Sequence, residues 1–156
     1  MKIRILLITL LMSVFMSNVQ AQGYGPNISL AQAKTVLAAA EAEAVKQNFT
    51  VAIAVVDTAG NLVAYSKIDN TQIASVHISQ GKAQSAVGFK RPTKALQDAL
   101  ATGGVNLRVL TLEGVVAAEG GIPLVHNGAI IGAIGVSGMT SEQDGIVANA
   151  GVAALK

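Results

Sequence analysis

The sequence has 156 residues, of which 51% are hydrophobic and 13% charged, and it contains neither cysteine nor tryptophan. This length fits a single domain, and the high apolar and low charged fractions exclude an intrinsically disordered chain. The absence of cysteine excludes a disulfide scaffold, a thiolate nucleophile and a zinc site built from cysteines.

Residues 1–21 have the pattern of a secretory signal. Lys2 and Arg4 precede an apolar run of twelve residues, and a small-x-small cleavage site ends at Ala21. Twelve apolar residues are too few to span a bilayer, which needs roughly twenty. We therefore expect cleavage to leave residues 22–156 as one domain, periplasmic or secreted, without stable membrane insertion.

The expected signal also accounts for the basic character of the chain. The whole sequence carries 11 basic and nine acidic side chains, and removing Lys2 and Arg4 leaves nine of each. A nucleic-acid-binding domain would show a basic stripe interleaved with aromatic side chains. The mature part is neutral and poor in aromatics, so the sequence disfavours a nucleic-acid partner.

The first elements after the signal are a helix and a hairpin. Ser29, three residues before Gln32, forms a capping-box pattern, and apolar residues then recur at helical spacing, which predicts a helix from Ser29 to about Gln47. Two β-branched runs, Val51–Val56 and Asn61–Lys67, flank Asp57-Thr58-Ala59-Gly60. Its glycine favours a hairpin turn with a bulge. We interpret Asp57 as a turn residue that binds its own backbone, because aspartate usually does so there.

A second helix is predicted from Thr71 to about Val87. Its expected apolar stripe consists of Ile73, Val76, Ala83 and Val87. His77 borders that stripe, on one face with Gln80, Gly81 and Gln84. An imidazole there can ligate iron or bind a buried ligand, and it can equally be a boundary histidine bonded to a neighbouring carbonyl. His126, the other histidine, adjoins a predicted turn and is interpreted as solvated.

The rest of the chain is predicted to return to strands between two helices. A short helix is expected from Thr93 to about Ala101, and Ser141 with Asp144 predicts the cap of a final helix through Ala154. Asn127-Gly128 favours a tight hairpin turn. The three apolar runs between the helices are Gly114–Ala118, Ile122–Val125 and Ala129–Val136. Hairpins imply an antiparallel sheet that helices must cover, which gives an α/β (α+β) fold class.

Three places are candidates for binding an anion. Arg91, in a basic segment, and Arg108, in an apolar stretch, suit the carboxylates of a small acid or of haem, although Arg91 can also lie in a plain solvated loop. The backbone amides from Gly138 to Ser141 can cradle a carboxylate or phosphate at a helix start. They can also form only a capped turn.

Four blocks of sequence resemble one known family. They are AVVDTAGNLVAYSKID (Ala54–Asp69), SQGKAQSAV (Ser79–Val87), EGGIPL (Glu119–Leu124) and GAIIGAIGVSGMTSEQDGIVANAG (Gly128–Gly151). The chain resembles the GlcG/HbpS group of haem-binding-type proteins, whose domain is similar to the C-terminal domain of PduO-type proteins. The likeness runs through nearly all of Ser29 to Ala154, so it covers the whole expected domain.

The resemblance implies a profilin-like, three-layer α/β/α fold with an antiparallel sheet, homo-oligomers and, for some members, haem binding outside the cytoplasm. It assigns no shared iron ligand. The residues carried over by motif as candidates for cofactor binding are Gly120, Gly121, Ile122, Pro123, Ser137, Gly138 and Glu142, with Gln143 and Asp144 in the same block.

Two classes of function are therefore expected. The first is a secreted or periplasmic protein that binds a small molecule, in particular haem, with His77 as the leading metal ligand and Arg91 and Arg108 at the propionates. Met139 and the tyrosines are weaker alternatives as ligands. The second is an enzyme or accessory protein acting on a small organic acid, as the glycolate-associated members suggest. The sequence assigns no catalytic residue.

Overall fold

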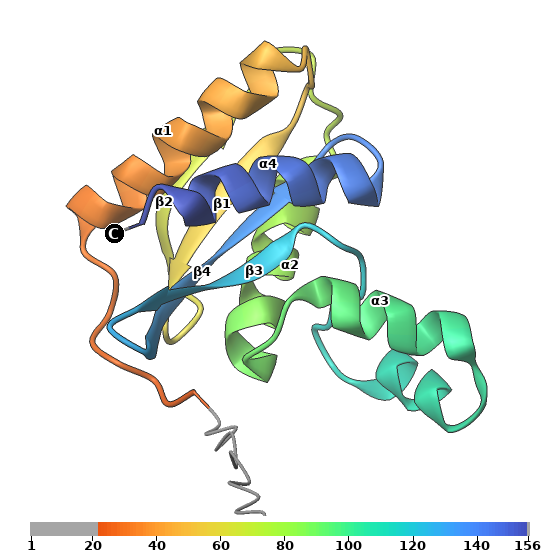
Figure 1. Cartoon of the computed structure of the whole chain (residues 1–156). Helices are drawn as coiled ribbons and strands as arrows, with labels where there is room; N and C mark the ends of the chain where they lie inside the picture. The colour runs from red at the N-terminus through yellow and green to blue at the C-terminus, as the bar shows by residue number, and fades with distance from the viewer. Residues whose placement is uncertain (1–21, 156) are drawn as a thin grey trace, which may run out of the picture.

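The fold is given by a computed structural model that describes residues 22–155 (Figure 1). The signal expected in residues 1–21 lies outside the described residues. The elements are α1 (Leu30–Lys46), β1 (Ala52–Asp57), β2 (Leu62–Lys67), α2 (Ser75–Phe89), α3 (Thr93–Thr102), the 3-10 segment η1 (Gly104–Thr111), β3 (Gly121–His126), β4 (Ala129–Ser137) and α4 (Ser141–Ala153).

The four strands form one antiparallel sheet in the order β2-β1-β4-β3. The predicted hairpin β1–β2 is present, with a register shift between Val55 and Val56. Asp57 Oδ1 accepts hydrogen bonds from the amides of Ala59 and Asn61, both at 2.9 Å, which confirms its interpretation as a turn residue. The second hairpin, β3–β4, follows the predicted Asn127-Gly128 turn.

Helices cover both faces of the sheet, as Figure 1 shows. On one face, α1 and α4 bury small and branched side chains against alternating residues of β1 and β4, among them Ile53, Val55, Ile134 and Val136. On the other face, α2 packs Ala83, Ala86 and Val87 against Val56 and Ala133. The expected three-layer α/β/α arrangement with an antiparallel sheet is confirmed.

Helix α2 differs from its sequence-based prediction. It begins at Ser75 rather than Thr71, and Ile73, placed in the expected apolar stripe, is 87% exposed before the helix starts. Ala83 and Val87 of the expected stripe are buried, and the other buried residues of α2 are Ser75, Ser79, Lys82, Ser85 and Ala86. Small side chains are required because the sheet beneath presents glycine. A β-carbon on Gly135 would overlap the carbonyl oxygen of Ser79.

One further prediction about the middle of the chain was wrong. Gly114–Ala118 is not a strand, and η1, which the sequence did not predict, precedes it. Side chains satisfy the backbone here in place of a strand partner, since Ser85 Oγ accepts from the amide of Val116 at 2.9 Å and Thr93 Oγ1 donates to the carbonyl of Ala118 at 2.6 Å. Buried backbone groups need such partners.

The helix caps agree with prediction at α1 and differ at α4. Ser29 and Gln32 form the expected capping box of α1. At α4 the capping box pairs Thr140 with Gln143, so Ser141 is the first helical residue and not the cap. Asp144 cannot serve as the capping acid because its carboxylate points into the protein, toward Lys82.

Candidate functional site

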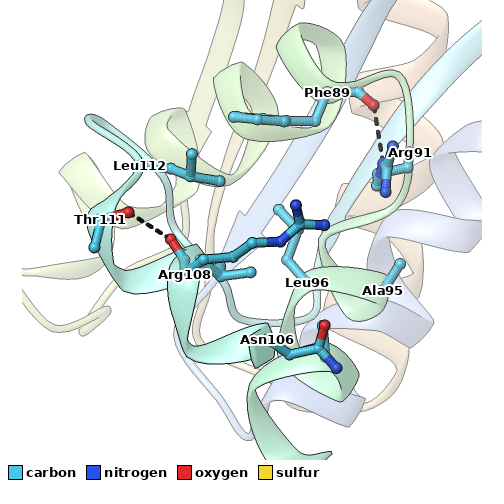
Figure 2. Close-up of a pocket in the computed structure, with 10 residues that line it drawn as sticks. Phe89, Arg91, Ala95, Leu96, Asn106, Arg108, Thr111 and Leu112 are labelled. Atoms are coloured by element: carbon cyan, nitrogen blue, oxygen red, sulfur yellow. Dashed lines mark hydrogen bonds between the residues drawn. The ribbon is translucent and has the colours of Figure 1, made fainter. Parts of the chain in front are cut away.

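A cavity of about 460 Å³ lies where the end of α2, helix α3 and η1 meet (Figure 2). Two arginines stand at this cavity. Its walls are otherwise largely apolar, from Phe89, Ala95, Leu96, Ala99, Val109 and Leu112, with Asn106 and Thr111 as polar members. The volume falls within the range of pockets that bind organic ligands, about 300–1,000 Å³.

The local structure explains why both arginines reach one cavity. Lys90 ends α2 in a left-handed conformation, with φ 52°, which turns the chain so that Arg91 leaves the helix axis. Arg91 Nε donates to the carbonyl of Phe89 at 3.1 Å. Arg108 comes from η1, and Figure 2 shows its side chain extending past Leu96 toward the side of Arg91. The structure thus brings together two residues that the sequence singled out separately.

The arginines leave hydrogen-bond donors available for a ligand. Among the hydrogen bonds and ion pairs of residues 22–155, none uses the guanidinium of Arg108, and Arg91 uses one nitrogen. Both residues are exposed. Guanidinium groups bind carboxylates with strong, charge-assisted hydrogen bonds. This cavity can therefore hold a molecule with an apolar body and one or two carboxylates.

His77 does not join the arginines. It lies exposed in the first turn of α2, whereas Arg91 follows the last residue of that helix, Phe89. Twelve residues separate His77 from Phe89, which is about 18 Å along a helix. The lining of the arginine cavity contains no histidine, methionine or tyrosine. Within residues 22–155, no group of three or more histidine, aspartate or glutamate side chains is placed to hold a metal ion.

The residues carried over by motif gather elsewhere, around a buried ion pair. Lys82 Nζ lies 2.7 Å from Asp144 Oδ2, and both side chains are almost fully buried, with 2% and 3% exposed. Gly120 packs directly on this pair, since a β-carbon there would lie 3.1 Å from Lys82 Nζ and 2.9 Å from Asp144 Cβ. The blocks SQGKAQSAV, EGGIPL and GVSGMTSEQD therefore meet at one point.

The other motif residues have distinct positions around that point. Gly120, Gly121 and Ile122 line a second cavity, of about 220 Å³. Pro123 is buried in β3 and Ser137 in β4, where its hydroxyl lies 3.4 Å from that of Ser75. Gly138 follows β4 in an extended conformation, and Glu142 is exposed in the first turn of α4.

The Asp144 carboxylate also occupies part of the predicted anion-binding site at the backbone amides of Gly138 to Ser141. Its Oδ1 accepts from the amide of Met139 at 3.0 Å, and the amide of Gly138 donates to the same carboxylate. These donors are thus already used by the protein's own carboxylate. Burial raises the pKa of Asp144 above its usual range, while Lys82 and the two amides act in the opposite direction.

Sequence reasoning missed the role of Lys82. A lysine inside a helix face made of serine and alanine, at positions Ser75, Ser79, Lys82 and Ser85, is a signal that was present but not used. Its partner lies 62 residues away, so spacing along the chain could not identify it.

In the described part of the chain, no helix is long and apolar enough to cross a membrane.

The fold and the motifs of this chain have close counterparts in known proteins. GlcG of Escherichia coli strain K12 is 40% identical over 110 residues, which are 70% of this chain and 81% of GlcG. Two solved structures share the fold. A double mutant of HbpS from Streptomyces reticuli has a TM-score of 0.78 with 30% identity, covering 88% of this chain and 96% of HbpS. A haem complex of PduOC has a TM-score of 0.76 with 27% identity, covering 83% of this chain and 96% of PduOC.

A family model extends the similarity over nearly the whole described chain. The family is described as haem degrading protein HbpS-like, and its model matches residues 28–153. That span includes every strand and helix of the fold as well as the motif blocks around Lys82 and Asp144. The chain belongs to the HbpS-like family.

Proposed function

We propose that this protein binds haem, with the propionates held by Arg91 and Arg108. The observation that carries the proposal is the meeting of two available guanidinium groups at one largely apolar cavity of about 460 Å³. Haem needs an apolar surface for its ring and cations for its two carboxylates. Phe89, Leu96 and Leu112 offer the first. The solved haem complex of the relative PduOC supports the same ligand.

An iron ligand is the part of a haem site that the cavity lining lacks. His77 is this chain's leading candidate, and in one copy it lies at the opposite end of α2 from the arginines. We therefore propose that His77 ligates the iron of a haem held by the arginines of a neighbouring copy. Bound haem would supply an iron centre there, and the protein's residues would orient the ring and shield it from water.

Haem titration followed by the Soret absorbance tests this function. We expect saturable binding at micromolar haem, and Arg91→Gln or Arg108→Gln to weaken it about tenfold or more, because each removes a charge-assisted bond of about 1.5–3 kcal/mol. Lys34→Gln, an exposed cation on α1, is the matched control and should bind as the unchanged protein does. His77→Ala should shift the Soret band. If the His77→Ala variant kept the Soret band of the wild-type protein, His77 would be rejected as the iron ligand. If the wild-type protein showed no saturable change in absorbance, haem binding itself would be rejected.

The second candidate function is action on a small organic acid. The same arginine pair favours it, since two guanidinium groups beside a cavity without an iron ligand in its lining also fit a dicarboxylate. If haem fails to bind while small carboxylic acids protect the protein against thermal unfolding, this second function replaces the first.

We further propose that the mature protein acts outside the cytoplasm as a homo-oligomer. The large side chains of η1 are unusually exposed for apolar residues, with Val105 at 83% and Leu110 at 71%, and a second copy would bury them. Protein recovered from the exported fraction is expected to begin at Gln22. Its molar mass from light scattering is expected to exceed that of a single mature chain. A retained Met1, or the mass of a single chain at micromolar concentration, would contradict the respective part.

A further inference from the structure

The second cavity, of about 220 Å³, has a different chemistry from the arginine cavity. The second lies between the start of α3, the start of β3 and α4. Its lining residues are Pro92, Lys94, Glu119, Gly120, Gly121, Ile122, Gly145 and Asn149. The volume is below the range of about 300–1,000 Å³ typical of drug-sized ligands, so it suits a molecule much smaller than a porphyrin.

Glycine on α4 allows a carboxylate to enter this cavity's wall. A β-carbon on Gly145 would lie 2.6 Å from Glu119 Oε1, so the Glu119 side chain rests directly against α4 at Gly145. The backbone of Glu119 is fixed by a hydrogen bond from its amide to Gln97 Oε1 at 2.8 Å. The residue is thus tied to α3 through its backbone, and its side chain lies against α4.

The side chains that remain available at the cavity are hydrogen-bond acceptors. No hydrogen bond among residues 22–155 uses the carboxylate of Glu119. Asn149, one turn after Gly145 on the same face of α4, donates its Nδ2 to the carbonyl of Gly145 at 2.8 Å, which leaves its Oδ1 available. The one ammonium in the lining, that of Lys94, is engaged by both oxygens of Asp98, at 2.9 and 3.0 Å.

The charge around the cavity is negative. The hydrogen bond and the charge of Asp98 raise the pKa of Lys94, and the carboxylates of Glu119 and Glu142 add to this effect, which places both of them within electrostatic reach. The charges of Lys82 and Asp144, which pack against Gly120, neutralise each other. Three carboxylates thus lie within electrostatic reach of one lysine, and a ligand that donates hydrogen bonds and carries positive charge fits best.

We infer that this cavity is a binding site for a small aliphatic primary amine, separate from the proposed haem site. The ammonium group of the amine lies between the Glu119 carboxylate and Asn149 Oδ1. These two acceptors, one charged and one neutral, take the place of water molecules that bind the ammonium in solution. The short alkyl chain of the amine contacts Pro92 and Ile122, the apolar members of the lining. A carboxylic acid or phosphate is excluded by repulsion from Glu119.

The test uses n-butylammonium chloride as the probe and 1-butanol as its uncharged counterpart. Amide chemical shifts of Gly120, Gly121 and Gly145 in ¹⁵N-labelled protein report the site directly. We expect saturable shifts with n-butylammonium and none with 1-butanol at equal concentration. Glu119→Gln keeps the shape of the side chain and should weaken binding about tenfold, because a charge-assisted bond becomes a neutral one. Glu41→Gln on α1 should leave the affinity unchanged.

A second variant keeps the inference testable if Glu119→Gln is poorly folded. Lys94 is exposed, and Lys94→Gln removes the one competing positive charge, so it should raise the affinity for n-butylammonium several-fold. Weaker or unchanged binding in Lys94→Gln, equal shifts with 1-butanol, or no saturation with either probe would each overturn the amine site. Haem titration of Glu119→Gln should match the unchanged protein, so failure of one site is distinguishable from failure of the other.

Discussion

Replacing Lys82 with methionine is expected to lower the free energy of unfolding by about 3–5 kcal/mol. Methionine fills much of the volume of lysine but leaves the buried carboxylate of Asp144 without its cation, at a site where 3% of that side chain is exposed. The amides of Gly138 and Met139 remain as partners, and they do not neutralise the charge. Denaturant unfolding followed by circular dichroism measures the loss.

Two controls separate the burial of charge from the loss of lysine as such. Lys94→Met breaks the exposed Lys94–Asp98 pair, which should cost less than about 1 kcal/mol because exposed ion pairs contribute little. The double variant Lys82→Met/Asp144→Leu should recover much of the stability, because it removes the unpaired charge. If Lys82→Met and Lys94→Met lowered the free energy of unfolding equally, the buried ion pair would contribute no more to stability than the exposed one.

Gly135→Ala is expected to cost about 3 kcal/mol, although it adds a single methyl group. The new β-carbon would overlap the carbonyl oxygen of Ser79 and come within 2.5 Å of the amide nitrogen of Ala83. Both obstacles belong to the backbone of α2, so no side-chain rotation relieves them and the helix must move away from the sheet. Overpacking of this kind costs about 1–3 kcal/mol and sometimes more. Thermal and denaturant unfolding of the variant measure the effect.

Gly88 gives the matched control on the same helix. A β-carbon there meets no atom within 4 Å, and its backbone is helical. Gly88→Ala should therefore leave stability unchanged or raise it by up to about 1 kcal/mol, since alanine favours a helix over glycine. If Gly135→Ala unfolded like Gly88→Ala, the close approach of α2 to β4 would not be a determinant of stability.

The elements that sequence reasoning found are those specified by neighbouring residues. The hairpins follow from the Asp57–Gly60 and Asn127-Gly128 turns, and α1 from its capping box, so their signals lie within a few positions. The loop at Gly114–Ala118 depends on partners elsewhere in the chain, Thr93 and Ser85. Local patterns could not supply those partners.

The candidate site likewise combines features that the local sequence indicates with features that only the folded chain creates. Residue type alone marked Arg91 and Arg108 as anion-binding candidates, but only the turn at Lys90 and the unexpected η1 bring them to one cavity. The position of His77 at the far, exposed end of α2 followed from the true start of that helix. Likewise, Lys82 and Asp144 lie on helices that cover opposite faces of the sheet, and their side chains meet beside Gly120 only in the folded chain.

Pro123, in the middle of β3, has a consequence for how the protein can associate with other chains. The strand order places β3 at the edge of the sheet, and proline there has no amide hydrogen to offer an incoming strand. An exposed edge with an uninterrupted row of amides is a template for aggregation, and a proline within six residues interrupts that row. This edge, one of the two of the sheet, is thereby protected against uncontrolled sheet extension.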